Sequence, residues 1–174
     1  GRLESILYPN GKREYFEYDK NGNLIRNSNM FGGTMFFWYD EMNRLVFKKV
    51  DNNNDESMYY SYYRNGLLKK EVLPKAFIGS DNISVANNWE FGTSYETIKT
   101  AIESNIANNN SNCFLYNYYF DNNLLKEVID PFGKKEEYGY NDNGLICRKT
   151  LKTSATELYD YYKGGLLKNR TITD

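Results

Sequence analysis

A motif that recurs about every 21 residues constrains the fold of this chain more than any other feature. In the first full copy, Phe16 and Tyr18 alternate with a charged residue, which is the period of a half-buried strand. Asp19 and Gly22 follow at the first and fourth positions of a tight turn, where Asp caps a backbone N–H and Gly tolerates a positive φ. Leu24 then opens a second strand. Each copy of the motif therefore predicts a β-hairpin together with its turn.

The hairpin pattern occurs six times, and a tyrosine just before the turn marks each copy. Tyr18 and Tyr39, for example, are 21 residues apart. In the fourth copy, Tyr118 preserves the aromatic–polar–aromatic order and Tyr119 preserves the 21-residue spacing, so two registers stay open. The positions that define the repeat are Tyr18, Asp19, Gly22, Leu24, Tyr39, Asp40, Leu45, Tyr62, Gly66, Leu68, Tyr140, Gly144, Ile146, Tyr161, Gly165 and Leu167.

The segments between hairpins are in phase as well. Glycines precede the marker tyrosine by seven residues in three copies and prolines precede it by nine in two; they are Gly11, Gly32, Gly133, Pro9 and Pro131. Both residue types favour turns, so we expect a turn between successive hairpins. Leu3 lies 21 residues before Leu24, and we therefore expect the chain to begin at the end of a hairpin turn, with a returning strand.

Residues 130–146 resemble the pattern DPxGxxxxYxYDxxGRL of the YD repeats, which are also called RHS (rearrangement hotspot) repeats. Tyr18-Asp19 and Tyr39-Asp40 keep the dipeptide that names the family, and the resemblance covers all of the chain except about residues 74–110. A second similarity, of residues 62–67 to a MORN repeat, is weaker, because the Tyr-Asp dipeptides and the Asp-Pro-x-Gly linker favour the YD repeat.

The resemblance implies a bacterial protein, extracellular or at the cell surface, since the family includes polymorphic toxin shells and toxin-complex components, and teneurins in animals. Long arrays of these repeats coil into a shell around a cargo, and the catalytic part of such toxins is a separate C-terminal domain. The copies in this chain are too few to close a shell. The resemblance therefore implies an architecture and no activity.

Residues 74–110 interrupt the repeat. Thr93 and Glu96 have the spacing of a capping box, with Thr93 as the N-cap. Ile98, Ala101, Ile102 and Ile106 follow at helical spacing. We expect a short amphipathic helix near 94–107, with its apolar side packed on a sheet face.

Together these patterns predict an all-β fold, a curved antiparallel meander of repeated β-hairpins with about 12 strands and one short helical insertion. A single hairpin is marginally stable, and stacked hairpins bury a continuous apolar stripe. We expect residues 1–174 to form a single domain, and we expect specificity to lie where the insertion meets the repeats.

Composition excludes several classes of function. The chain has no histidine, which removes Ser–His and Cys–His nucleophile pairs and most zinc sites. Its net charge of −1 argues against nucleic-acid binding, and no apolar run is long enough to span a membrane. Cys113 and Cys147 fit no metal spacing and are expected to be half-buried thiols, with a single bridge as the alternative. Asp51 and Asp55 loosely resemble a calcium loop, but a polar turn is the favoured interpretation.

The sequence thus predicts a non-catalytic structural or interaction module with no cofactor and with an unknown protein or glycan as partner. Glu136 and Glu137 cannot serve as a glycosidase pair, because adjacent strand residues point to opposite faces. The alternative is a carbohydrate- or peptide-binding module that stacks its ligand on Trp38 and Trp89. Trp38 replaces a small or polar residue of the other copies, and it lies either beneath the insertion or exposed for a ligand.

Overall fold

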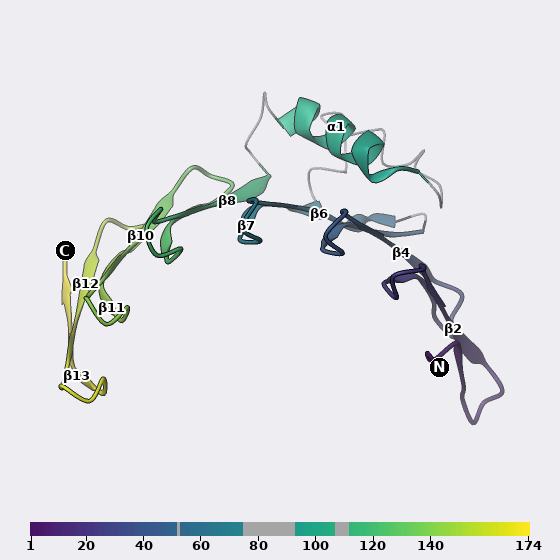
Figure 1. Cartoon of the computed structure of the whole chain (residues 1–174), viewed down its shortest axis with the longest axis horizontal. Helices are drawn as coiled ribbons and strands as arrows, with labels where there is room; N and C mark the ends of the chain where they lie inside the picture. Colours follow the sequence, from purple (N-terminus) through teal and green to yellow (C-terminus); the bar gives the residue numbers. More distant parts are fainter. Residues whose placement is uncertain (52, 75–92, 107–111) are drawn as a thin grey trace. The chain divides into compact units, whose positions relative to one another are not determined.

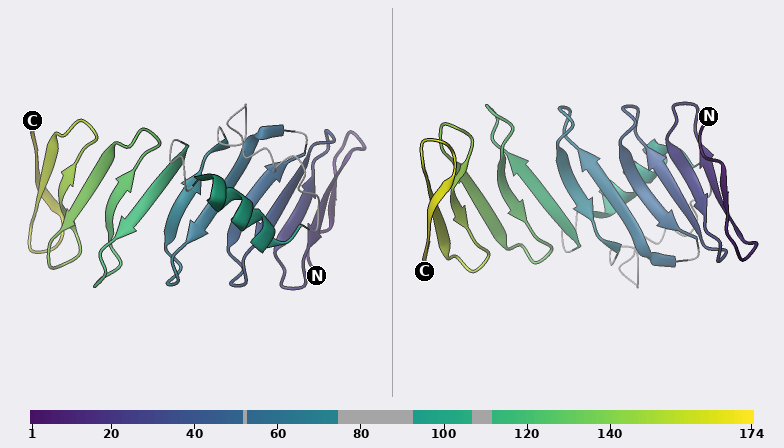
Figure 2. Two further views of the ribbon diagram at one scale, coloured as in Figure 1. Left: turned by 90° about the horizontal axis from the view of Figure 1, so that it is seen from above. Right: turned by 90° about the horizontal axis from the view of Figure 1, so that it is seen from below.

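The computed structural model describes residues 1–51, 53–74, 93–106 and 112–174 (Figure 1). These residues form a 13-stranded antiparallel sheet in which each strand pairs with its neighbours in sequence (Figure 2). The strands are β1 (Ser5–Leu7), β2 (Arg13–Tyr18), β3 (Leu24–Ser28), β4 (Thr34–Tyr39), β5 (Leu45–Val50), β6 (Asn53–Tyr62), β7 (Leu68–Val72), β8 (Cys113–Tyr118), β9 (Leu125–Ile129), β10 (Lys135–Tyr140), β11 (Ile146–Thr150), β12 (Thr156–Tyr161) and β13 (Leu167–Thr173). The predicted all-β meander is confirmed; the leading strand before the six hairpins brings the strands to 13.

The chain divides into two compact units. Unit 1 comprises residues 1–61 and 71–112, and unit 2 comprises residues 62–70 and 113–174. The single domain expected over residues 1–174 stays a prediction. No helix in the described part of the chain is both long and apolar enough to cross a membrane.

The hairpin turns have the chemistry that the sequence predicts. The Gly22 N–H donates to the Asp19 carbonyl over 3.1 Å, and Gly22 has φ of 97°. The Asp19 carboxylate accepts the Asn23 N–H over 2.8 Å. In the second hairpin, Asn43 replaces the glycine and adopts φ of 59°. Asn tolerates this left-handed conformation better than other residues with a Cβ, so the turn is preserved.

Turns between hairpins follow the same scheme. The Gly133 N–H donates to the Asp130 carbonyl over 2.9 Å, with Pro131 at the second position, where its fixed φ suits a type I turn. Gly11 and Tyr8 are bonded in the same way around Pro9. The prediction of a turn at the shared proline and glycine positions is therefore confirmed.

The fourth hairpin settles the two registers that the sequence left open. Tyr118 faces Leu125, as Tyr18 faces Leu24 in the first hairpin. The turn that follows is one residue longer, because the Asn123 N–H donates to the Tyr119 carbonyl four residues back. Tyr118 is therefore the marker tyrosine, and Tyr119 is the first residue of the turn.

Helix α1 (Tyr95–Ile106) packs over strands β4 to β6 of unit 1 (Figures 1 and 2). Ile98 and Ile102 are fully buried, together with Phe47 and Tyr59 of the sheet. The Tyr59 hydroxyl donates to the Glu103 carboxylate over 3.0 Å. The predicted short helix is present, and its apolar side forms the main core of unit 1.

The helix begins one residue later than the capping box predicts. The Ser94 hydroxyl, and not that of Thr93, accepts the Thr97 N–H, over 3.2 Å. Thr93 has another role, because its carbonyl accepts the indole N–H of Trp38 over 3.1 Å. The predicted Thr93 cap is therefore wrong, since contact with the sheet holds Thr93 outside the helix.

Candidate functional site: a groove between two hairpin turns

A groove of about 530 Å³ lies in unit 1 beside the turns of the first two hairpins. We call it the turn groove. Three elements form its walls: the first turn, the second turn, and the segment that leads into α1. Their lining residues are Asp19, Asn21, Asn23, Tyr39, Asp40, Glu41, Asn43 and Thr93–Glu96. It therefore joins the repeat to the insertion, where we expected specificity.

Asparagine side chains tie the two turns together. The Asn43 side-chain oxygen accepts one N–H from Asn21 over 2.9 Å and one from Asn23 over 2.8 Å. Successive turns are close together at other places as well. The Arg2 guanidinium lies so close to Gly22 that an added Cβ would overlap it, and a Cβ added to Gly165 would lie 3.8 Å from Leu145. This turn-to-turn ladder holds the groove walls at a defined separation.

Trp38 lies beneath the inner end of the turn groove and is only 8% exposed. Its ring packs 5.2 Å from Phe47 and 6.2 Å from Phe36, between ring centroids. Its indole N–H holds the Thr93 carbonyl, so the side chain anchors the entry to α1 on the sheet. Little of the ring is left for a ligand to stack on. Trp89 lies outside the described residues.

Four carboxylates line the turn groove, and its described lining includes no lysine or arginine. Burial opposes ionisation of Asp19 and Asp40, but hydrogen bonds outweigh it and hold the pKa of both carboxyls below the ordinary value. These bonds come from Asn23 and turn amides at Asp19, and from Arg44 and turn amides at Asp40. Both groups are therefore charged at neutral pH.

The other two carboxylates of the turn groove are exposed. Glu41 lies in the second turn, and Glu96 lies in the first turn of α1, 3.5 Å from the Lys99 ammonium. Exposure makes the side chains of Glu41 and Glu96 accessible to a ligand. The carboxylates of Asp19 and Asp40 are less accessible, because they accept hydrogen bonds within their own turns.

Two half-buried tyrosines complete the turn groove. The Tyr39 hydroxyl donates to the Leu24 carbonyl over 2.9 Å, and burial together with the charge of Asp19 raises its pKa. Burial also raises the pKa of Tyr95; the charge of Lys99 opposes this shift, and the charges of Glu96 and Asp40 add to it. Aromatic rings beside carboxylates and amides suit a ligand with apolar and polar parts.

The marker tyrosines chiefly join one hairpin to the previous one. The Tyr161 hydroxyl donates to the Ile146 carbonyl over 2.7 Å, as Tyr39 does to Leu24. The Arg2 guanidinium lies 5.6 Å from the centre of the Tyr18 ring. The structure thus places these repeat-defining residues in contacts between successive hairpins.

An equivalent hollow of about 260 Å³ lies in unit 2, between the turns of the third and fourth hairpins. Asn65 and Asn123 are bonded there over 2.9 Å, as Asn21 and Asn43 are in unit 1. Aromatic rings take the places of three carboxylates: Tyr63, Tyr119 and Phe120 stand where unit 1 has Asp19, Asp40 and Glu41. The acidic lining is therefore a property of the turn groove and not of the repeat.

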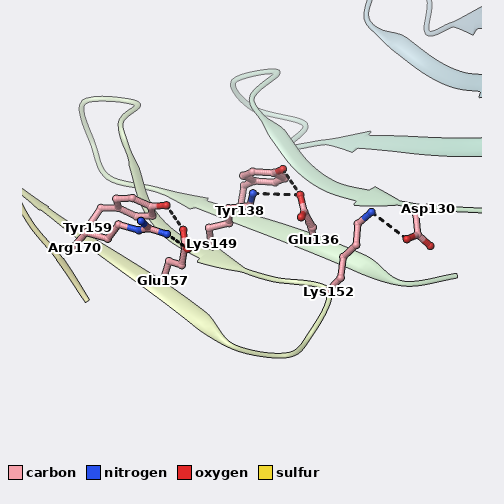
Figure 3. A network of polar contacts seen from close by, with 8 residues as sticks. All are labelled: Asp130, Glu136, Tyr138, Lys149, Lys152, Glu157, Tyr159 and Arg170. Atoms are coloured by element: carbon pink, nitrogen blue, oxygen red, sulfur yellow. Dashed lines mark hydrogen bonds and ion pairs between the residues drawn. The ribbon is translucent and has the colours of Figure 1, made fainter. Parts of the chain in front are cut away.

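Three carboxylates of unit 2, those of Asp130, Glu136 and Glu157, are already paired (Figure 3). Glu136 accepts the Tyr138 hydroxyl over 2.9 Å and lies 3.3 Å from the Lys149 ammonium. A second triad, 21 residues further on, consists of Glu157, Tyr159 and Arg170. Asp130 pairs in addition with Lys152 over 3.0 Å. These repeated contacts are characteristic of structural ion pairs.

Other candidates from the sequence do not assemble into a site. Cys113 and Cys147 are both free, so the bridge considered between them is not formed. Among the described residues, no group of three or more potential ligands could hold a metal ion. Asp51 lies in a turn, as expected of a polar connection, whereas the side chain of Asp55 lies outside the described residues.

No protein-family profile and no curated protein matches this chain. The crystal structure of TcdB2-TccC3 is similar to it with a TM-score of 0.50 and 10% identity, over 93% of this chain and 9% of that one. The TcdB2-TccC3-Cdc42 crystal structure and the Photorhabdus luminescens Tc holotoxin pore, with a TccC3 mutation, each give 0.41 at 11% identity over the same shares. At such identities the likeness concerns the fold alone, and this chain spans about 9% of the matched chains.

Proposed function

We propose that the chain is a non-catalytic structural and interaction module and that it is part of a YD-repeat protein of a bacterial cell surface or secreted assembly. The phased repeat supports the family, and the fold similarity to TcdB2-TccC3 is consistent with it. The surface or secreted location follows from the family resemblance and is part of the proposal.

One observation carries the structural role: successive turns contact each other through the same two positions in both units. The last residue of one turn covers the fourth residue of the next, as Arg2 covers Gly22 in unit 1 and Leu124 approaches Gly144 in unit 2. Such nearest-neighbour contacts stabilise repeat proteins, because each repeat lacks a core of its own.

Limited proteolysis tests this role. A scaffold tied turn to turn should keep all six hairpins intact at protease concentrations that digest an unfolded control chain. Rapid cleavage at several hairpin turns under native conditions would contradict it, since cleavage requires the local opening that the ladder opposes.

The proposed lack of catalysis has its own test. Carboxylate-based glycoside hydrolysis needs no histidine, but Glu136 is held by Tyr138 and Lys149. A panel of chromogenic glycosides should give no turnover above a heat-denatured control. Turnover that is lost on Glu136→Gln would overturn this part of the proposal.

A second candidate function is binding of a carbohydrate or peptide at the turn groove, favoured by its rings, amides and carboxylates. Tyr95 is the half-exposed ring at its outer wall. A glycan array with the wild-type protein and Tyr95→Ala tests the carbohydrate version. Equal signals from both proteins would exclude the turn groove as a glycan site.

A further inference from the structure

The turn groove and its counterpart in unit 2 share their asparagine contacts but differ in charge. In unit 2 the three equivalent positions carry aromatic rings, so the repeat folds without carboxylates there. Asp19 and Asp40 cap their own turns, so the carboxylates that invite an explanation beyond the fold are Glu41 and Glu96. The smaller volume in unit 2, about 260 Å³ against about 530 Å³, shows that the turn groove also has more room.

The charge of the turn groove is one-sided. Asp19, Asp40, Glu41 and Glu96 contribute carboxylates, and its described lining contributes no cation. Arg44 neutralises Asp40 in part, with its guanidinium 2.7 Å from the carboxylate. Lys99 lies 3.5 Å from Glu96 and 5.4 Å from the centre of the Tyr95 ring, so it offsets part of the charge on that wall. The remaining negative field favours a positively charged ligand over a neutral one.

The chain itself shows how one of its turns receives a cation. The Arg2 guanidinium lies over the Tyr18 ring and donates to the Asp19 carbonyl over 3.2 Å. Tyr39 and Asp40 are the equivalent residues of the turn groove, and there the position of Arg2 is taken by the shorter Asn23. The ring and the turn are thus present at Tyr39 and Asp40, and among the described lining residues no cation takes the place that Arg2 has at the first turn.

We propose that the turn groove binds an arginine or lysine side chain of a basic peptide segment in a partner protein. This deepens the proposed interaction role and rests on it. The Tyr39 ring flanks the cation, and Glu41 supplies a carboxylate that the turns do not use themselves. Glu96 and the Tyr95 ring lie on the opposite wall, where they already contact Lys99.

Fluorescence anisotropy on the full chain tests this inference. The probe is a labelled decapeptide with three arginines, and its control is the same peptide with citrulline, which keeps the shape and removes the charge. The test variant is Glu41→Gln with Glu96→Gln. The matched control is Asp121→Asn with Asp142→Asn, which changes the net charge equally at exposed turn residues of unit 2.

We expect the arginine peptide to bind, the citrulline peptide to bind at least tenfold more weakly, and affinity to fall with rising salt. The groove variant should lose about tenfold in affinity, and the control variant less than twofold. Equal losses in the two variants, or equal binding of both peptides, would overturn the inference. Binding of a neutral oligosaccharide in the turn groove, without binding of the peptide, would also overturn it. In either case the structural role, tested by proteolysis, would stand.

Discussion

Two neighbouring glycines in the last hairpin turn allow the effect of backbone strain to be measured apart from the effect of adding a side chain. Gly165 has φ of 81°, whereas Gly164 does not adopt a positive φ and has nothing within 4 Å of an added Cβ. Gly165→Ala should lower the free energy of unfolding by about 1 kcal/mol or more, because a side chain is strained in the left-handed region. Gly164→Ala should leave it unchanged or raise it slightly. Urea denaturation measures both, and equal effects would contradict the turn assignment.

Tyrosines at the first turn position reach forward to the next hairpin. The Tyr119 hydroxyl donates to the Tyr138 carbonyl over 2.9 Å, and the Tyr119 ring packs edge-on against Tyr140. Tyr119→Phe should therefore lower the free energy of unfolding by about 1 kcal/mol. Tyr162 holds the same turn position and is 59% exposed, so Tyr162→Phe is the matched control and should have little effect in the same urea titration.

The Tyr138 hydroxyl makes stability depend on alkaline pH. Burial, the hydrogen bond to Glu136 and its charge raise the pKa of Tyr138 to about 12. A folded-state pKa above the unfolded value means that the contribution to stability is complete below about pH 10 and is lost as the pH rises toward 12. Between these pH values, the free energy of unfolding from urea titrations should fall less steeply with pH for Tyr138→Phe than for the wild type. Parallel pH profiles would contradict the assignment.

At this scale the sequence predicted the turns well, because Asp19 and Gly22 act within four residues of each other. It did not predict the hydrogen bond from Tyr119 to the next hairpin. From the sequence alone, tyrosine in the place of the capping Asp indicates only that the turn has lost its cap. Only the neighbouring hairpin shows that the hydroxyl has a partner.

At the scale of elements, helix α1 is the part of unit 1 whose packing is easiest to test. Ile102 is fully buried against the sheet, whereas Ile172 in β13 is 56% exposed. Ile102→Ala should lower the free energy of unfolding by about 2–4 kcal/mol, because it removes buried apolar surface and leaves a cavity. Ile172→Ala should cost well under about 1 kcal/mol. A similar small cost at both sites would contradict the packing of α1.

Helical spacing was enough to locate α1, but its start depended on tertiary contact. Thr93 and Ser94 are both good N-caps by residue type. The Trp38 indole binds the Thr93 carbonyl, and Ser94 is left to cap the helix. In the same way, the sequence singled out Trp38 as an exception but could not decide between burial and exposure, because the answer depends on a segment 55 residues away.

At the scale of the whole molecule, the order of the strands followed from the repeat. Every hairpin carries its own turn, and short connections force antiparallel neighbours. The turn groove could not be predicted from the repeat, because Asp19, Asp40 and Glu96 come together only when two turns and the insertion meet. The sequence indicated the location of the groove only indirectly, through the place where the insertion interrupts the repeat.

The central claim is a chain of hairpins in which each strand pairs with its sequence neighbours in the register set by the marker tyrosine. Cross-strand backbone NOEs in a multidimensional NMR spectrum test it most directly. We predict NOEs within the fourth hairpin for Tyr118 facing Leu125, and between hairpins for Arg26 facing Phe36 and Arg148 facing Leu158. NOEs that pair Tyr119 with Leu125, or that join strands distant in sequence, would contradict it.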